Sequence, residues 1–223
     1  MKVDTHMHTA EYSPDSFLPI AEAVARAREM GIDGLCVTDH DSMGARAVIE
    51  KWRKDLDFPL FLGCEVLTSD GDIVCFGLDR APEPAALSAP ELIKRVRHCG
   101  GCTVAAHPFR NNNRGLEDLI STVEGLDGVE CFNGSTDPQA NLHALDLAKK
   151  SGRALLGAAD AHYRRRLGLF VTEFDDELRD EEDLIVAVRS GKCRPLAWNG
   201  HEFVSAEEFC RAQLKEQEAA ARR

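Results

Sequence analysis

The 223-residue sequence lacks the compositional bias of disordered or fibrous proteins. Glycine and proline contribute only 17 and 9 residues, while hydrophobic residues make up 43% and charged residues 29%. These fractions are typical of globular proteins. There is no internal repeat, no low-complexity segment and no linker-like break in composition, so we expect a single domain over residues 1–223. A chain of this length buries roughly 70% of the surface of its unfolded state and needs no disulfide bonds.

An excess of positive charge is also lacking. Lysine and arginine total 27, against 38 aspartate and glutamate residues, which gives a net charge of −11. A protein that holds nucleic acid through its phosphates should be basic. We therefore expect no duplex nucleic acid as a partner, although divalent ions bound in one cleft would cancel much of the negative charge locally.

No apolar run approaches the ~20 residues of a membrane span. The opening Met1-Lys2-Val3-Asp4 does not resemble a signal peptide, and there is no glycine-rich phosphate-binding loop. Most of the eight cysteines lie inside apolar runs, as free thiols of a reduced compartment do. Cys99 and Cys102 have CxxC spacing, but they flank a Gly-Gly turn and are interpreted as structural. We expect a cytoplasmic protein with no membrane partner.

Strand-like apolar runs alternate with helical patterns along the whole chain. The predicted strands are 3–7, 34–38, 59–67, 72–78, 102–106, 129–132, 154–158 and 169–174. The predicted helices are 18–30, 46–54, 90–99, 116–123, 141–150 and 184–190, followed by a charged, alanine-rich surface helix within 205–223. The turn Ser69-Asp70-Gly71 predicts a hairpin between the third and fourth strands. This alternation favours an α/β fold with a parallel sheet, either a barrel or a doubly wound sheet.

Five of the eight histidines lie at the carboxyl end of a predicted strand. They are His6, His8, His40, His107 and His162, and Glu65 ends another strand in the same way. In a parallel barrel these strand ends meet on one rim. Residues at i and i+2 of a strand share a face, so Asp4, His6 and His8 can point the same way, as can Asp160 and His162.

Imidazole and carboxylate ligands together suit manganese, zinc or iron. Six or more of them exceed the need of one tetrahedral ion, so we expect two or three divalent metal ions that share a bridging carboxylate. If the histidines were only buried core residues, many polar groups at one rim would lose their hydration at a large cost in free energy. We therefore favour a metal site over this interpretation. His98, His143 and His201 lack this context and are interpreted as structural.

The motifs DTHMHT, VTDHD, GCEV, AHPF and GAADAH, in this order, resemble those of the polymerase and histidinol phosphatase (PHP) family. The resemblance covers about residues 2 to 174 and is to the small stand-alone members, because no polymerase segment is present. It implies a distorted TIM-like (β/α)7 barrel that holds a two- or three-metal site and hydrolyses phosphate esters.

The same resemblance implies which residues hold the ions. The first ion would lie between His6, His8 and Asp160, the second at His107 and the third at His40 and His162, with Glu65 bridging the first two.

Two ligands are less firmly placed by the resemblance. The third ion would take an acidic group from the loop after the first strand, which is Asp15 or, as the fallback, Glu11. The last ligand of the second ion would follow Val129-Glu130. There, strand alternation places Cys131 and Asn133 on one face, and we favour Asn133 over Cys131.

Chemically, such ions would present hydroxide to phosphorus and neutralise charge on the phosphoryl oxygens. Either Asp15 or His162 would donate the proton to the leaving group. Asp4, Asp39 and Asp41 adjoin ligand histidines. They would either orient the second ring nitrogen of those histidines or act only as turn residues at strand ends.

Arginines follow two of the ligand motifs. Arg110 comes shortly after His107, and Arg164 opens a run of three arginines after His162 and Tyr163. We expect Arg110 and Arg164 to bind a substrate phosphate, because the guanidinium fork matches phosphate oxygens. Tyr163 and Phe109 are candidates for stacking on a base, although Phe109 would fit the core equally well.

We therefore expect a metal-dependent phosphoric ester hydrolase that acts on a small phosphomonoester, either a nucleotide or a sugar phosphate. One alternative is a 5′-3′ exonuclease on short 5′-phosphorylated oligonucleotides, which would release mononucleotides rather than free phosphate. Another is a non-catalytic regulator that binds metal or ligand at this site. Manganese, zinc and iron all fit the donor types.

Overall fold

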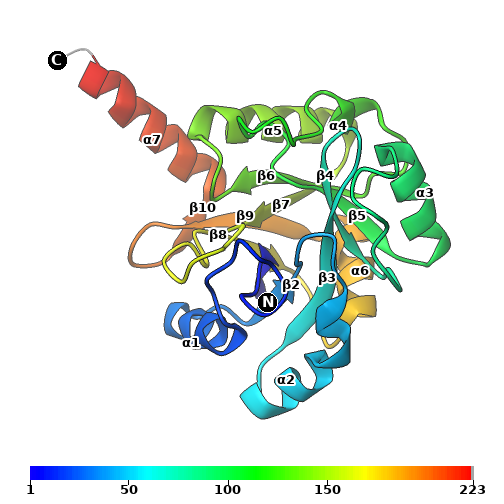
Figure 1. Ribbon diagram of the computed structural model, residues 1–223. Coiled ribbons are helices and arrows are strands. Elements are labelled where there is room, and N and C mark those ends of the chain that lie inside the picture. Colours follow the sequence, from blue (N-terminus) through cyan, green and yellow to red (C-terminus); the bar gives the residue numbers. More distant parts are fainter. Residues whose placement is uncertain (222–223) are drawn as a thin grey trace.

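The computed structural model describes residues 1–221 (Figure 1). Ten strands within this range form one sheet in the order β10-β9-β8-β1-β2-β3-β4-β5-β6-β7. The strands are β1 (Lys2–Met7), β2 (Gly34–Val37), β3 (Leu60–Leu67), β4 (Asp72–Phe76), β5 (Cys102–Ala105), β6 (Gly128–Asn133), β7 (Ala154–Ala158), β8 (Phe170–Phe174), β9 (Cys193–Trp198) and β10 (Phe203–Ser205).

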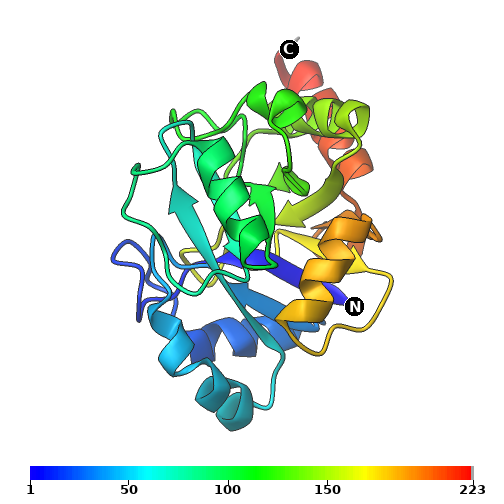
Figure 2. The same cartoon turned by 90° about the vertical axis from the view of Figure 1, so that its right-hand side faces the viewer.

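The helices lie around the outside of this sheet, except that α7 projects away from the body (Figures 1 and 2). They are α1 (Ile20–Met30), the 3-10 turn η1 (Gly44–Ala47), α2 (Ile49–Leu56), α3 (Ala89–His98), α4 (Leu119–Thr122), α5 (Pro138–Ser151), α6 (Glu181–Ser190) and α7 (Ala206–Ala221). Helix α1 illustrates why they form where they do. Its buried residues recur at helical spacing, and it ends at Gly31, whose φ of 67° favours a residue without a Cβ atom.

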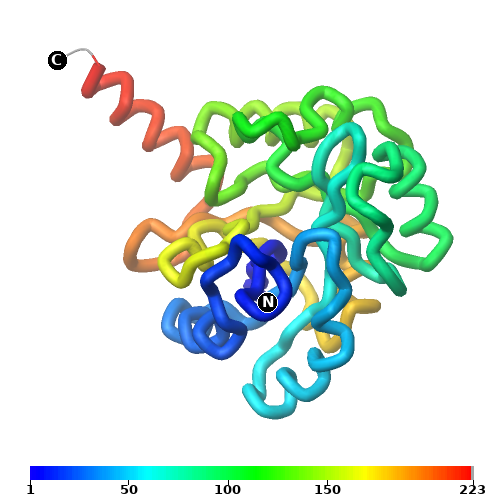
Figure 3. The backbone as a smooth tube through the Cα atoms, in the orientation of Figure 1, coloured from blue at the N-terminus to red at the C-terminus, as the bar shows by residue number. Residues whose placement is uncertain are grey.

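Strands β1 to β7 curl into a distorted barrel that closes where β1 meets the segment after β7. The N–H of His8 donates to the carbonyl of Ala161 at 3.0 Å, and the N–H of Asp160 donates to the carbonyl of His6 at 2.9 Å. Figure 3 shows this juncture, with the blue N-terminal segment beside the yellow segment that follows β7. The α/β fold with a distorted (β/α)7 TIM-like barrel that we expected is confirmed.

One strand of the barrel runs against the others. Strand β4 is antiparallel to β3 and β5, so the predicted hairpin is confirmed. Leu67, the last residue of β3, pairs with Asp72, the first residue of β4. Because the second strand of a hairpin begins where the first one ends, Asp72 lies at the rim formed by the carboxyl ends of the parallel strands.

Strand β6 contains a β-bulge at Cys131. Glu130 pairs with Leu156 and Phe132 pairs with Gly157, so two steps along β6 match one step along β7. A bulge of this kind breaks the strict alternation of side chains. The expectation that Cys131 and Asn133 share a face rested on that alternation, and the bulge overturns it.

The core consists of three apolar clusters. One packs α3, α4 and α5 against the β4–β6 part of the sheet, and a second packs α1 against β1–β3. The third joins α6 to residues in the first halves of the strands, such as Val3, Cys102 and Ala154. The end of the barrel opposite the carboxyl rim is therefore filled with apolar side chains.

Every predicted strand and helix has a counterpart, but the sequence did not predict β9 and β10. Strand β9 contains Pro195 and is largely half-exposed, so it lacks both the apolar run and the clean alternation of a typical strand. The predicted tail helix is observed as α7, and residues 222–223 of it lie outside the described residues. Among residues 1–221, no helix combines the length and apolar character needed to cross a membrane.

Candidate metal centre

The structure brings the strand-end histidines and acids together at the carboxyl rim. All of them except His40, His162 and Asp15 are almost completely buried. Glu65 lies at the centre. Its Oε2 atom is 3.4 Å from the Nε2 atoms of both His6 and His8, and its Oε1 atom is 2.9 Å from Nε2 of His107. This position suits the bridging role that the resemblance implies for Glu65.

The first group of ligand atoms comes from β1 and from the segment after β7. Asp160 Oδ1 is 3.3 Å from His8 Nε2 and 3.7 Å from His6 Nε2. The two histidine Nε2 atoms are themselves only 3.0 Å apart. His6, His8 and Asp160 thus form a compact triad of possible ligands, as expected for the first ion.

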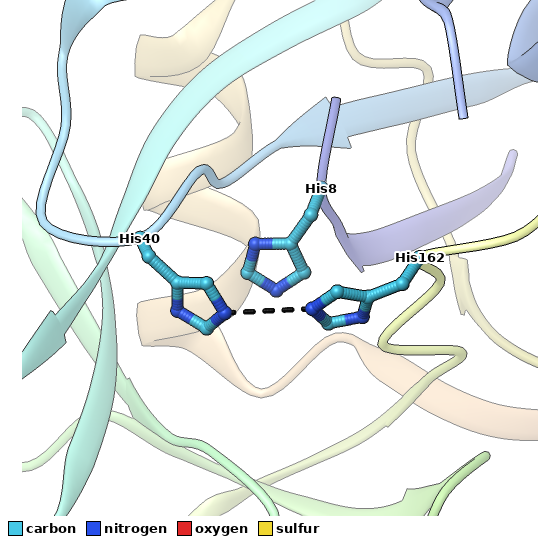
Figure 4. Close-up of side chains that lie close together, drawn as sticks. All are labelled: His8, His40 and His162. Carbon is cyan, nitrogen blue, oxygen red and sulfur yellow. Dashed lines mark hydrogen bonds between the residues drawn. The ribbon is translucent and has the colours of Figure 1, made fainter. Parts of the chain in front are cut away.

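A second group lies nearer the surface, where His8, His40 and His162 point toward one another (Figure 4). The Nε2 atoms of His40 and His162 are 3.4 Å apart. Asp15 Oδ2 lies 3.2 Å from His40 Nε2 and 3.3 Å from His162 Nε2. Glu11, the fallback ligand, lies elsewhere, because its carboxylate accepts the backbone N–H of Ile20 at the start of α1.

A third group contains Glu65, His107 and Asp72. Asp72 Oδ2 is 3.8 Å from His107 Nε2 and 2.7 Å from Arg114 Nε. Burial raises the pKa of Asp72 to about 6, and the negative charge of Glu65 acts in the same direction. Sequence reasoning missed Asp72. The predicted hairpin could have revealed it, since the first residue of the returning strand lies beside the end of β3.

The two residues considered as the last ligand of the second ion are used differently. The side-chain amide of Asn133 donates to Glu130 Oε2 at 3.0 Å, and its oxygen accepts the N–H of Ser135 at 2.8 Å. Cys131 lies in an apolar cluster, where its thiol donates to the carbonyl of Val129. Burial raises the pKa of this thiol well above its ordinary value. The β-bulge thus turns Cys131 away from the rim and leaves Asn133 beside Glu130.

Glu130 is a second residue that sequence reasoning missed. Its Oε1 atom lies 2.7 Å from His6 Nδ1, and its Oε2 atom accepts the backbone N–H of His107 at 3.0 Å. A carboxylate on one imidazole nitrogen fixes the ring and leaves the other nitrogen free for a metal. Glu130 therefore aims Nε2 of His6 at the centre of the cluster. An acidic residue in the middle of an otherwise apolar strand was the available signal.

The three aspartates beside the histidine motifs hold backbone and loops. Asp4 accepts the N–H groups of Ala159 and Gly168, and Asp41 accepts that of Leu67. In the part of the chain that the structure describes, neither carboxylate hydrogen-bonds a histidine ring. Asp39 is linked to a histidine ring only indirectly, through Ser13, whose hydroxyl donates to the Asp39 carboxylate.

Ser13 in turn links Asp39 to the ligand set. Its Oγ atom lies 3.3 Å from Nδ1 of His8. A hydroxyl at that nitrogen holds the ring of His8 with Nε2 toward Asp160 and Glu65.

Charge and burial oppose each other within the cluster. Burial acts to lower the pKa of His6, but the carboxylates of Glu130 and Glu65 outweigh it and raise this pKa well above its ordinary value. At His8 burial prevails and lowers the pKa to about 4. Burial acts to raise the pKa of Glu65, yet the attraction of His6 holds it well below its ordinary range, and Asp160 behaves in the same way. Glu65, Asp160 and His8 are thus in the unprotonated states that metal ligands need, while His6 carries a proton that a bound cation would displace.

Several buried atoms at the centre lack a hydrogen-bond partner within residues 1–221. They are Glu65 Oε2, His40 Nδ1 and His107 Nδ1. Glu65 Oε2 and His40 Nδ1 lie 2.7 Å apart, but not in hydrogen-bond geometry. An unsatisfied buried polar group costs about 1–3 kcal/mol. A cation bound at Glu65 Oε2 would remove that cost for the carboxylate, and the mixed imidazole and carboxylate groups around it fit a centre of divalent ions.

The predicted arginines take different positions. Arg110 reaches the centre, with Nη1 2.7 Å from Asp160 Oδ2. Arg164 instead pairs with Glu29 and Glu22 on α1, so the structure does not bring its guanidinium to the rim.

A cavity of about 310 Å³ opens beside the centre. It is lined by Asp15, Arg110, Ser135, Asp160, His162, Tyr163 and Arg166. A larger cavity of about 520 Å³ runs along Asp70 and Leu116–Thr122, away from the histidines. Phe109 packs edge-on against His143 rather than lining the cavity beside the centre.

Comparisons with known proteins agree with this architecture. A protein of Methanocaldococcus jannaschii is 32% identical over 143 residues, which cover 60% of this chain and 82% of that protein. The PolC-type DNA polymerase III of Lacticaseibacillus paracasei is 31% identical over 93 residues, or 41% of this chain and 6% of the polymerase. A Bacteroides vulgatus two-domain protein, described as containing a predicted PHP-like metal-dependent phosphoesterase, superposes with a TM-score of 0.67. That alignment has 16% identity and covers 89% of this chain and 64% of the other, so it bears on the fold alone.

The family model described as PHP-associated matches residues 138–193, which run from the start of α5 to the start of β9. The ordered motifs of the sequence converge on the rim of a barrel that is also found in a PHP-like protein. Taken with the 32% identical relative, these findings establish that the chain belongs to the PHP-domain family.

Proposed function

We propose that the protein is a metal-dependent phosphoesterase that hydrolyses a small phosphomonoester, either a nucleotide or a sugar phosphate. The observation that carries the proposal is the convergence of ionised carboxylates and imidazoles around the buried Glu65, next to a cavity that contains Arg110. That cavity has the size of a small-molecule site rather than of a groove for a long strand.

The proposed ligands follow the three groups of side chains. His6, His8 and Asp160 would hold the first ion, Glu65, His107 and Asp72 the second, and His40, His162 and Asp15 the third, with Glu65 shared between the first two. Asp72 replaces Asn133 in this set because its carboxylate lies in the group with Glu65 and His107, whereas the Asn133 side chain is hydrogen-bonded to Glu130 and Ser135. Manganese, zinc and iron all suit such mixed ligands.

When bound, the ions would lower the pKa of a coordinated water toward neutrality and stabilise charge on phosphate oxygens. The chain's own residues would position the ester. Arg110 lies in the cavity against Asp160, and a phosphate that enters would offer its guanidinium two further acceptors. Arg166, which donates to the carbonyl of Gly134, lines the same cavity and takes the phosphate-binding role first expected for Arg164.

The proton for the leaving oxygen is assigned to His162 in the state in which only the first two ions are bound and His162 is not occupied as a ligand. Partial burial acts to raise the pKa of Asp15, but the neighbouring His40 and His162 lower it below its ordinary value. An ionised Asp15 suits a ligand better than a proton donor. His162 lines the cavity and is about one-fifth exposed, so it can exchange protons with solvent.

The test uses metal-free protein reconstituted with Mn²⁺. It would be incubated with nucleoside monophosphates, sugar phosphates and short 5′-phosphorylated oligonucleotides, and the products would be identified. We expect free phosphate from at least one small ester, lost in Asp160→Asn. Asp146→Asn is the matched control, because Asp146 is exposed on α5 and belongs to none of the three ligand groups.

Each other outcome has a definite meaning. Mononucleotides released from oligonucleotides would replace the phosphatase with an exonuclease. Metal binding without any product would contradict the proposal, and the protein would then be interpreted as a regulator that binds metal or a ligand.

A further inference from the structure

Tyr163 lines the cavity beside the candidate metal centre, and its ring stacks on the exposed ring of Phe17. Within residues 1–221, Phe17 is 67% exposed and Tyr163 is 46% exposed. Their rings stack on each other with centroids 5.3 Å apart and an angle of 12° between the planes. Aromatic rings normally gain stability through burial, so an exposed Phe17 ring held parallel to a half-exposed Tyr163 ring needs another explanation.

The pair is tied to the residues proposed to act on phosphate. Phe17 follows Asp15 by two residues, and Tyr163 directly follows His162. The backbone N–H of Phe17 donates to the carbonyl of His162 at 2.9 Å, which locks the two loops together. The pair is therefore fixed relative to the candidate metal centre.

One cavity joins the two ends of the site. Tyr163 lines it together with Arg110 and Asp160, so one ring of the aromatic pair shares a single space with the phosphate-binding groups. The guanidinium of Arg165 lies 6.0 Å from the ring centroid of Tyr163 and adds a planar cation at the same place. A flat, π-faced group attached to a phosphate would contact both ends at once.

We propose that Phe17 and Tyr163 form a nucleobase platform, so that the substrate is a nucleotide rather than a sugar phosphate. This inference rests on the proposed phosphoesterase function and narrows its substrate class. Stacking on an aromatic side chain is worth roughly 1–3 kcal/mol per base, which corresponds to about 5- to 150-fold in affinity. Because every base has a π-face, the platform selects for the presence of a base and not for its identity.

The decisive comparison is between adenosine 5′-monophosphate and ribose 5-phosphate, which carry the same phosphoryl group with and without the base. In the Mn²⁺-loaded protein we expect Phe17→Ala and Tyr163→Ala to raise KM for the nucleotide by about 5- to 150-fold. We expect both variants to leave KM for ribose 5-phosphate unchanged. Tyr163→Phe keeps the ring and should behave like the wild type. Leu119→Ala is the control for loss of an exposed apolar side chain, since Leu119 is 43% exposed on α4.

A binding experiment separates failure of the platform from failure of the proposed function. Fluorescent 1,N6-ethenoadenosine monophosphate would be titrated with wild-type protein and with Tyr163→Ala. Tighter binding to the wild type, without any hydrolysis, would support the platform and contradict the phosphoesterase. Equal KM values for the two esters, or equal losses on both in the alanine variants, would overturn the platform and leave the phosphoesterase standing.

Discussion

The rim of the barrel and the C-terminal unit of β9, β10 and α7 are held by opposite kinds of contact. At the rim, buried imidazoles and carboxylates crowd around Glu65, and several of their polar atoms have no partner. Where the C-terminal unit packs on the barrel, Phe170 of β8 stacks on Phe132 and meets Phe209 of α7 edge-on, and Lys149 of α5 pairs with Glu207 on the surface.

This difference distinguishes residues that are positioned to bind a ligand from residues that stabilise the fold by packing. A core of aromatic side chains gains free energy on folding without help. A buried cluster of like-charged carboxylates loses free energy unless cations join it. Stability should therefore depend on metal at the rim and be independent of metal in the C-terminal unit.

The largest effect on stability is expected from the aromatic stack. Phe170→Ala would leave a cavity between two other rings and should cost about 3–5 kcal/mol of unfolding free energy. Urea denaturation would measure this loss, with Phe170→Leu as the milder control. Mn²⁺ binding by the folded variant should match the wild type, and a large loss of metal affinity would contradict the independence of the two regions.

Removal of metal should affect the rim next most strongly. Mn²⁺ at 100 times its dissociation constant should stabilise the fold by about 2.7 kcal/mol, or roughly 5–11 °C in Tm for a chain of this size. Differential scanning calorimetry with Mn²⁺ and then with excess chelator would show the gain and its reversal. Asp160→Asn should reduce the gain, while Asp146→Asn should retain it. Identical melting curves with and without metal would contradict the claim that the stability of the rim depends on metal.

Glu130→Gln tests the residue that orients His6. The amide keeps the shape of the side chain but replaces a charge on His6 Nδ1 with a neutral acceptor. Metal affinity should fall by about 10- to 100-fold, because partners of this kind tune ligand strength to that extent. Isothermal titration with Mn²⁺ would measure it, and Glu124→Gln on the loop before β6 is the matched control. An unchanged affinity would assign Glu130 to backbone support alone.

The smallest effect is expected at the surface of the C-terminal unit. Lys149→Met removes the ion pair with Glu207 and should cost less than about 1 kcal/mol, as exposed pairs do. The hydrogen bond from Lys149 lowers the pKa of Glu207 below its ordinary 4.5. The contribution is therefore fully present above pH 4.5 and disappears as the pH falls through the folded-state pKa. Urea denaturation from pH 7 downward should show the two proteins converging, and a constant difference would contradict this origin.

Much of the fold could be predicted because its signals are local. Apolar periodicity and turn residues revealed the alternation of elements and the β3–β4 hairpin, and the strand-end histidines revealed the rim. The bulge at Cys131 could not be predicted, because its cause lies in the pairing of β6 with β7 and not in the residues of β6 alone.

The same limit explains why the sequence predicted the wrong position for Arg164 and no role at the rim for Glu130 and Asp72. Arg164 lies on Glu29, 135 residues away along the chain, and only the packing of α1 beside its loop makes that contact possible. Glu130 and Asp72 were overlooked because each was considered within its own strand. Their roles arise from neighbours on β1 and β3.

The closure of the barrel at β1 has a consequence for how the chain is made. Strand β1 is synthesised first, yet it pairs with β8, and its end bridges to Ala161. During translation more than 150 further residues must be synthesised before these partners of β1 leave the ribosome. His6 and His8 reach the ribosome exit long before Asp160, so a nascent chain offers two imidazoles without their closing carboxylate. Metal capture at the first site would then coincide with the last step of barrel closure, and chains stalled before residue 160 would carry an open sheet edge prone to association.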